Sequence, residues 1–368
     1  MSDVLAIARS RIALALERVR PAYPRSAIER LPKWLNLVPM VAQWCWLGWR
    51  HRSLTLPSAA NPCLTAGGLV GDGKAEYFAG MGPLARARVA PFVMVRPGGD
   101  DALGEALSAM HESALRFPVV AKPDLGWCGF GVCRLDNVPA LAAYLARFPA
   151  GESLMLQRFL DEPGEAGIYY VRAPEQAHGR LLGVLLRHYP QVTGDGVSTL
   201  GELVCRDARL RRGLRDRHHA ADFDPASVPA AGVSVRLSLI GSTRVGGRYE
   251  DASDSATPAL LAAVDAIARD MPQFHVGRFD VRYGSLQELR NGHFTIMEIN
   301  GAGAEAVHAW DPRHSLVEAY RIVFAKQRLL FALGAANRAR GHRPVGMRAL
   351  ARHYLRQQRL ISRYPPSN

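Results

Sequence analysis

The spacing of apolar and polar positions divides the chain into a helical beginning, a mixed middle and a helical end. Apolar residues recur on one helical face over Val4–Val19, which predicts an amphipathic helix. Short apolar runs with glycine and proline nearby, such as Phe117–Lys122, predict strands in the middle of the chain. Residues 326–368 contain arginines and apolar residues but no acid, and we expect a basic helical tail there.

The segment Phe294–Asn300 has the apolar, β-branched character of a strand. Because side chains alternate between the two faces of a strand, we expect Glu298 and Asn300 on one face and Met297 and Ile299 on the other. This strand therefore presents a carboxylate and an amide oxygen together.

A partner strand is predicted upstream over Val276–Tyr283, where the same alternation gathers an acid and two cations on one face: Arg278, Asp280 and Arg282. The polar connection at 284–292 ends in Asn-Gly, which is a hairpin signal. Folding the hairpin about its midpoint places Asp280 across from Glu298. Two carboxylates and an amide oxygen then converge.

Hard oxygen ligands of this kind suit Mg²⁺, which takes one or two carboxylates and fills its remaining positions with water and phosphate oxygens. We therefore predict Asp280, Glu298 and Asn300 as metal ligands, with Arg278 and Arg282 as the catalytic cations beside them. The alternative is a surface hairpin with solvated acids, and these residues alone do not decide between the two.

A second group of candidate residues surrounds a glycine-rich loop. Phe117–Lys122 is typical of a strand that ends on a lysine, and the next strand begins at Val132. The loop between them contains Gly126, Gly129 and Gly131, whose backbone amides can close over phosphate oxygens without obstruction by side chains. Lysine occurs at only four positions in this arginine-rich chain, so Lys122 stands out as a compact charge for phosphate.

The stretch Gly68–Lys74 has the spacing of a phosphate-binding loop, G-x₄-G-K, but lacks the context that such a loop needs. Position 75 is alanine, where a serine or threonine would bind Mg²⁺, and no clear strand precedes the glycines. We therefore interpret this stretch as a chance match and expect at most a turn near the site. Lys74 is not expected to bind nucleotide.

Composition narrows the class of protein. At 368 residues with hydrophobic content near half, the chain is long enough for two or three packed subdomains. Its five cysteines are odd in number and lack zinc-binding spacing, which argues against a disulfide framework and fits a reducing compartment. The sequence shows no signal-peptide pattern, so we expect a cytoplasmic location.

The net charge of +13 is concentrated at the two ends. Residues 1–52 hold nine Lys and Arg against three acids, and residues 326–368 hold ten against none, so the body between them is close to neutral. Within the first segment, Trp34–Trp49 is a run of sixteen uncharged residues with four tryptophans. It is shorter than a membrane span of about 20 residues and is interrupted by Pro39.

Two interpretations of this tryptophan-rich run stay open. One is a helix packed on the body of the protein. The other is a peripheral element on the anionic inner face of a membrane, because tryptophans with flanking cations are typical of interfacial segments. Nucleic acid fits the run less well, since an apolar aromatic segment suits lipid better than a phosphate backbone.

Taken in order, the candidate pieces resemble the ATP-grasp superfamily. The matching pieces are Lys122 with its glycine loop, the strand Gln157–Leu160, Glu165, Arg187, and the set Asp280, Glu298 and Asn300. The segment 192–200, together with Arg236 and Gly246-Gly247, is most similar to the peptide-ligase branch that contains cyanophycin synthetase. D-alanine–D-alanine ligases are more distant, and the resemblance covers residues 117–325.

The resemblance implies an α+β, ATP-grasp fold in which two α+β subdomains grip ATP, with an atypical helical N-terminal region and a basic helical C-terminal tail. The expected divisions are an N-terminal region of amphipathic and tryptophan-rich helices, a small subdomain with the glycine-rich lid, a large subdomain with the metal site, and the tail: residues 1–116, 117–190, 191–325 and 326–368.

The resemblance also implies roles for individual residues. Those expected to bind ATP are Lys122 and Arg187 on the phosphates, Gly126, Gly129 and Gly131 in the lid, Gln157, Phe159 and Leu160 around adenine, and Glu165 on the ribose. Asp280, Glu298 and Asn300 would hold two Mg²⁺, with Mn²⁺ as an alternative. Arg236 would face the γ-phosphate and the acyl phosphate, as a third catalytic arginine.

The activity implied is an ATP- and Mg²⁺-dependent ligase that joins a carboxylate to an amine through an acyl phosphate. Its substrates would be small-molecule or peptide carboxylates and amines. One alternative is a phosphotransferase of the same fold. Another is a basic membrane- or nucleic-acid-binding module with a degenerate ATP site.

Overall fold

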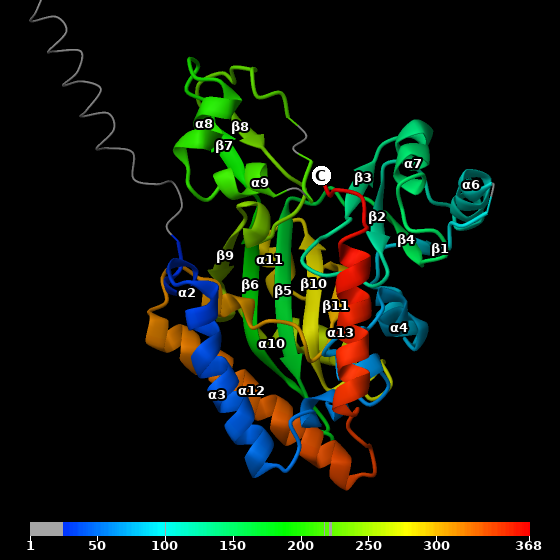
Figure 1. Cartoon of the computed structure of the whole chain (residues 1–368), viewed down its shortest axis with the longest axis vertical. Coiled ribbons are helices and arrows are strands. Elements are labelled where there is room, and N and C mark those ends of the chain that lie inside the picture. Colours follow the sequence, from blue (N-terminus) through cyan, green and yellow to red (C-terminus); the bar gives the residue numbers. More distant parts are fainter. Residues whose placement is uncertain (1–24, 100, 217, 221–222) are drawn as a thin grey trace, which may run out of the picture.

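The computed structural model describes residues 25–99, 101–216, 218–220 and 223–368. The amphipathic helix predicted over Val4–Val19 lies outside the described residues. Two antiparallel sheets and the helices packed on them form the body of the molecule (Figure 1). The α+β fold class expected from the sequence is confirmed.

The smaller sheet has four strands in the order β1-β4-β2-β3, all antiparallel. Its strands are β1 (Phe92–Val95), β2 (Val119–Pro123), β3 (Cys133–Leu135) and β4 (Leu154–Arg158). Two helices pack beside it, α6 (Ala102–Glu112) and α7 (Val138–Leu145). Asn137 caps α7 by accepting a hydrogen bond from the backbone N–H of Ala140. Leu141, Leu154 and Leu156 fill the core between them.

The larger sheet has five strands in the order β11-β10-β5-β6-β9. These are β5 (Gly164–Val171), β6 (Arg180–His188), β9 (Arg248–Asp251), β10 (Val276–Tyr283) and β11 (Thr295–Asn300). Apolar residues such as Phe279 and Ile296 point from one face toward α10 (Pro258–Arg269) and form the main core. Strand alternation turns the intervening polar residues, including Asp280, to the other face.

The hairpin predicted around Asp280 and Glu298 is present in the expected register, since these two residues are paired across β10 and β11. Two details differ. The connection contains a short helix, α11 (Leu286–Arg290), rather than a tight Asn-Gly turn. A β-bulge follows the Asp280–Glu298 pair, so that Met297 is left between paired residues and joins the cavity wall instead of the opposite face.

A small third unit projects from the larger sheet (Figure 1). It contains the paired strands β7 (Gln191–Thr193) and β8 (Ser234–Arg236) and the helices α8 (Leu200–Arg206) and α9 (Arg211–Arg215). Thr199 and Glu202 form a capping box at the start of α8, each accepting a hydrogen bond from the backbone N–H of the other.

The tryptophan-rich run is a single helix, α3 (Lys33–Arg50), which lies alongside α12 (Leu316–Ala339) (Figure 1). The Gln43 side chain donates a hydrogen bond to the carbonyl of Phe324, at 2.8 Å, and the Trp44 ring packs edge-on against Phe331. Among the described residues, no helix is both long enough and apolar enough to cross a membrane.

The remaining helices are short, except for α13 (Met347–Ile361) near the end of the chain. The short helices are α2 (Ala27–Arg30), α4 (Lys74–Ala79), α5 (Pro83–Arg86) and the 3₁₀ helices Leu56–Ala59, Thr65–Gly68, Thr243–Val245, Ser253–Ser255 and Val307–Trp310.

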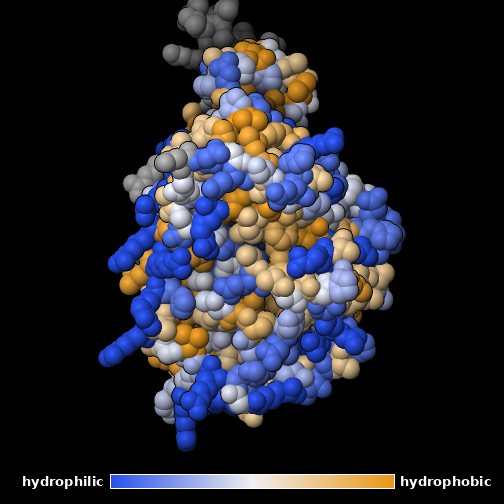
Figure 2. All heavy atoms as spheres, turned by 90° about the vertical axis from the view of Figure 1, so that its right-hand side faces the viewer, coloured by the Kyte–Doolittle hydropathy of each residue, from blue (hydrophilic) through white to orange (hydrophobic). Residues whose placement is uncertain are grey.

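Figure 2 shows hydrophilic side chains projecting among hydrophobic ones on the side of the molecule that carries the smaller sheet.

The two sheets divide the chain differently from the expected boundaries. β1 belongs to the smaller sheet, so this unit begins before residue 117. β5 and β6 were expected in the small subdomain, but both are in the larger sheet, where β5 pairs with β10. The physical reason is that sheet pairing is a long-range property, whereas each strand's local pattern of apolar residues is the same in either sheet.

A buried ion pair connects α2 to the third unit and leads to a stability prediction. Glu29 and Arg209 are each about 2% exposed, and their closest side-chain atoms are 2.6 Å apart. Removing one partner of a buried ion pair typically costs about 3 kcal/mol or more. We therefore expect Glu29→Ala to lower the free energy of unfolding by about 3 kcal/mol in urea titrations.

The matched control is Arg356→Ala, which removes the ion pair with Glu152 from a side chain that is 63% exposed. Exposed pairs contribute less than about 1 kcal/mol, so this variant is expected to unfold close to the wild type. Equal losses in the two variants would contradict a structural role for the Glu29–Arg209 pair.

Candidate active site

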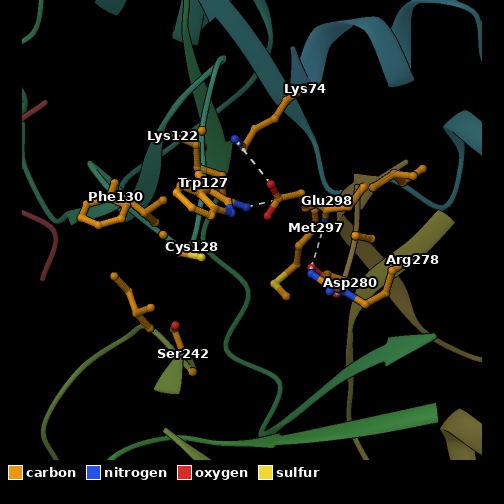
Figure 3. Close-up of a pocket in the computed structure, with 18 of the residues that line it drawn as sticks. Lys74, Lys122, Trp127, Cys128, Phe130, Ser242, Arg278, Asp280, Met297 and Glu298 are labelled. Atoms are coloured by element: carbon orange, nitrogen blue, oxygen red, sulfur yellow. Dashed lines mark hydrogen bonds and ion pairs between the residues drawn. The ribbon is translucent and has the colours of Figure 1, made fainter. Parts of the chain in front are cut away.

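A cavity of about 420 Å³ is lined by residues from both sheets and from the glycine-rich loop. Figure 3 shows Lys74 and Lys122 directed toward Glu298, with Asp280 and Arg278 deeper in the large sheet. All but two of the predicted site residues line this cavity: Lys122, Gly126, Gly129, Gln157, Phe159, Leu160, Glu165, Arg187, Arg278, Asp280, Arg282, Glu298 and Asn300.

Asp280 is the centre of a charged network on the cavity side of the large sheet. Arg278, two residues away on the same strand, donates to both of its carboxylate oxygens at 2.7 and 3.0 Å. Arg187 and Asn300 each donate to Oδ2 at 3.1 Å. Burial alone would raise the pKa of Asp280, but the Arg187 and Arg278 guanidinium groups outweigh this effect and lower it.

Glu165 extends the network to the neighbouring strand. Its Oε1 accepts a hydrogen bond from Arg187 at 2.9 Å, and its Oε2 accepts one from the Tyr189 hydroxyl. Arg187 therefore bridges Glu165 and Asp280 across the sheet. Since both carboxylate oxygens of Glu165 are engaged within the protein, the residue fixes Arg187, and the predicted contact with ribose stays a prediction.

Lys122 lies at the opposite wall, on β2. It is 8% exposed, and its Nζ donates to the side-chain oxygen of Gln157 at 2.6 Å and to the Met297 carbonyl at 3.4 Å. Burial lowers the pKa of Lys122 to about 8, although Glu298 acts in the opposite direction. The Gln157 side chain therefore orients the ammonium group of Lys122.

Lys74 was interpreted from the sequence as part of a chance match, but its side chain enters the same cavity. It is 7% exposed, donates to the Pro123 carbonyl at 3.0 Å and forms an ion pair with Glu298 at 3.4 Å. Thr65–Gly68 is a 3₁₀ helix, and no strand precedes it among the described residues, so the stretch lacks the strand–loop–helix arrangement of a phosphate-binding loop. The structure therefore adds the Lys74 side chain to the candidate site, where at most a nearby turn was expected.

The glycine-rich loop covers the cavity with backbone that ordinary residues rarely adopt. Cys128, Gly129 and Gly131 all have positive φ, at 46°, 75° and 73°. Arg244, in the 3₁₀ helix Thr243–Val245 that follows the third unit, donates to the carbonyls of Cys128 and Gly129, at 3.2 and 3.5 Å. Gly131 is not part of the cavity wall, because it packs against Pro123 and Tyr364.

The end of the chain also holds this loop. The Tyr364 hydroxyl donates to the Leu125 carbonyl, and the Gln357 side chain donates to the Gly126 carbonyl, both at 2.9 Å. Asn368 accepts a hydrogen bond from the backbone N–H of Arg134 at 3.0 Å. The region expected only as a basic tail therefore positions both ends of the loop.

Arg236 is the second predicted residue that the structure does not bring to the cavity wall. It lies on β8, donates to the Ser238 carbonyl at 2.9 Å and stacks over the Tyr189 ring. Arg236 thus reaches the network indirectly, through Tyr189 and Glu165. Its predicted contact with the transferring phosphate stays a prediction.

Glu305 is a cavity residue that sequence reasoning missed. It is exposed, and no hydrogen bond or ion pair of its carboxylate occurs among the described residues. The only local signal was its position in the turn after the strand that carries Glu298 and Asn300. Tyr189 and the exposed Trp127 of the glycine-rich loop were also missed.

The donor set can be compared with what Mg²⁺ requires. Within the described part of the chain, no group of three or more His, Cys, Asp or Glu side chains is arranged to hold a metal. One carboxylate and an amide oxygen are nevertheless enough when phosphate oxygens and water complete the shell. Glu298 and Asn300 fit this requirement best, because Asp280 is already neutralised by two arginines.

No family model and no curated protein matches the sequence. Solved structures do match. The bifunctional glutathione synthetase from Pasteurella multocida has 18% identity and a TM-score of 0.34, covering 68% of this chain and 34% of that one. D-cycloserine synthetase has 17% identity and a TM-score of 0.35, covering 70% of each chain. The D-alanine–D-alanine ligase of Bacillus anthracis has 13% identity and a TM-score of 0.38, covering 73% and 68%.

The chain thus spans about a third of the length of the glutathione synthetase that it matches.

The position of the two lysines leads to a binding prediction. Both ammonium groups are buried in the wall of the same cavity, so each contributes a poorly screened positive charge to it. We expect Lys74→Ala and Lys122→Ala each to weaken ATP binding by about tenfold or more, measured by calorimetry. Arg147→Ala, a change at an exposed position on the smaller sheet's helical side, is the control. Unchanged affinity in Lys74→Ala would restore the original interpretation.

The pKa of Lys122 leads to a prediction for pH. Because this pKa is about 8, the ammonium is present below pH 8 and is lost as the pH rises through that value. ATP affinity should therefore fall on the alkaline side in the wild type. Lys122→Arg retains its charge throughout this range, so its affinity should be nearly independent of pH. The dissociation constant for ATP measured between about pH 7 and 9 in both proteins checks this, and parallel curves would contradict it.

Proposed function

We propose that this protein is an ATP- and Mg²⁺-dependent ligase that joins a carboxylate to an amine. The observation that carries the proposal is a pair of buried lysines in one cavity beneath the glycine-rich loop, Lys74 in an ion pair with Glu298 and Lys122 hydrogen-bonded to Gln157. Two buried ammonium groups, a loop rich in backbone donors and a metal-binding carboxylate are together suited to a polyphosphate.

The proposed reaction needs no nucleophilic side chain from the protein. A carboxylate is a poor electrophile, and transfer of the γ-phosphoryl group converts it to an acyl phosphate that an amine attacks. The amide bond forms as phosphate leaves, and the products are the amide, ADP and phosphate. Catalysis then depends on positioning and on neutralising the charge of the transferring group.

The residues divide this work by position. Lys122 and Lys74 hold phosphates from the small-sheet side, and the loop at 126–131 covers them. Arg278 and Arg187 are anchored by Asp280, so that their charge stays fixed in the cavity. Arg282 lies within 3.8 Å of Glu165 and adds a further cation. Gln157, Phe159 and Leu160 are at the end of β4, where the adenine is proposed to lie.

Glu298 and Asn300 are the residues that would hold Mg²⁺ together with phosphate oxygens. The metal would neutralise charge on the phosphates and orient them. The ion pair between Glu298 and Lys74 keeps this carboxylate in place in the structure described here.

The proposal extends to the amine. Every other carboxylate of the wall, namely Asp72, Asp124, Glu165, Asp280 and Glu298, has a hydrogen bond or ion pair, whereas Glu305 has none among the described residues. An exposed, unpaired carboxylate at the cavity edge is suited to receive an ammonium group. Glu305 is therefore the proposed contact for the amine substrate.

The test is ADP release screened against pools of carboxylic acids and amines, with mass spectrometry of the products. Glu298→Gln should reduce amine-dependent ADP release by about 100-fold or more, because the change removes the carboxylate charge and keeps the size of the side chain. Glu175→Gln, a matched change at an exposed position, should leave it unaltered. ADP release that needs a carboxylate or alcohol but no amine would instead favour the phosphotransferase, and near wild-type turnover in Glu298→Gln would refute the site.

A further inference from the structure

Helix α3 has an apolar stripe that no described part of the chain covers. The stripe consists of five apolar residues whose spacing places them on one helical face. Their side chains are exposed by more than half: Trp34 (68%), Leu37 (53%), Val38 (56%), Val41 (55%) and Trp49 (78%). A helix of 18 residues carries this surface along its whole length. Contiguous exposed apolar patches of this kind mark interaction surfaces rather than ordinary protein surface.

The opposite face of α3 is already fixed to the body. Leu47 is 3% exposed and packs with Leu56 and Phe331, and Trp44 packs on the same phenylalanine. Gln43 also forms its hydrogen bond with α12. The helix therefore does not depend on the stripe to fold, and the two large tryptophans at its ends are available for a partner.

The surroundings of the stripe are cationic. Arg30, Arg50 and Arg52 are exposed near the two ends of α3, and the Arg50 guanidinium lies over the Trp46 ring. The sequence contains no acid between Glu29 and Asp72. Arg338 of the neighbouring α12 is also exposed, and it donates to the His51 carbonyl at 3.1 Å, which places a further cation at the C-terminal end of α3.

These charges decide between the candidate occupants. A second copy meeting this face by two-fold symmetry would place cations against the same cations. Residues 1–24 carry four arginines against two acids, so this segment does not complement the charge either. An anionic lipid surface complements both features, because it attracts the arginines and accepts the tryptophans at the level of its headgroups.

We propose that α3 docks on an anionic phospholipid bilayer, parallel to its surface, with the Trp34–Trp49 stripe in the headgroup region. The cations around the stripe contribute the electrostatic part of the binding and the apolar residues the remainder. This inference depends on the α3 surface alone and stands apart from the proposed ligase activity.

Sedimentation of the full chain with vesicles tests the proposal. We expect binding to phosphatidylglycerol-rich vesicles, weakened by salt, and little binding to pure phosphatidylcholine. Trp34→Ser with Trp49→Ser should lower the vesicle partition coefficient by about tenfold or more, with the circular dichroism spectrum unchanged because both side chains are exposed. The control is Val197→Ser with Val228→Ser, two exposed apolar residues of the third unit.

A second pair of variants tests the charge. Arg50→Gln with Arg52→Gln should reduce both the binding and its dependence on salt, whereas Arg116→Gln with Arg147→Gln, exposed near the smaller sheet, should change neither. Three outcomes would overturn the proposal: a wild-type protein that stays in the supernatant at low salt, equal binding to both kinds of vesicle, or a dimer in ultracentrifugation that the two tryptophan changes dissociate.

Discussion

The cavity depends on one constraint: the carboxylates and arginines buried on one face of the five-stranded sheet must compensate one another's charge. Asp280 is fully enclosed, and a carboxylate in that position is stable only when cations compensate it. Arg278 and Arg187 supply that charge, and Glu165 in turn holds Arg187. The consequence is a rigid row of side chains across β5, β6 and β10, in which each member is oriented by its neighbours.

A second constraint lies on the other side of the cavity, where hydrogen bonds to the backbone carbonyls fix the position of the glycine-rich loop. The glycine-rich loop is attached to the smaller sheet, but its carbonyls accept hydrogen bonds from Arg244 and from Gln357, which belong to distant parts of the chain. Tyr364 and Asn368 add contacts at the two ends of the loop. The position of the loop over the cavity therefore depends on three regions together, and any opening must break the contacts with Arg244 as well as those with α13.

The contrast between Glu298 and Lys74 shows how much the sequence could predict. The pairing of Asp280 with Glu298 was predictable because strand alternation and a short connection fix which residues face one another. The bulge at Met297 was not, because nothing in a run of apolar residues marks the extra position. Lys74 reaches Glu298 from more than two hundred residues away, and its local pattern suggested a loop that the structure does not form. Local patterns thus predicted the faces of strands, and tertiary packing decided which distant side chain completed the site.

The cations of the cavity fall into two groups, according to whether acidic side chains of the protein neutralise their charge. Arg187 and Arg278 are paired with acids, so they add little net charge to the cavity. Lys74 is paired with Glu298, whereas Lys122 has no ion pair among the described residues, which leaves positive charge for a bound anion to balance. In the proposed function, a polyphosphate would bring more negative charge than the two lysines neutralise, and a divalent cation beside Glu298 would offset the excess. The paired arginines would then be the fixed frame of the cavity, and the lysines would be the cations that the nucleotide and the metal balance.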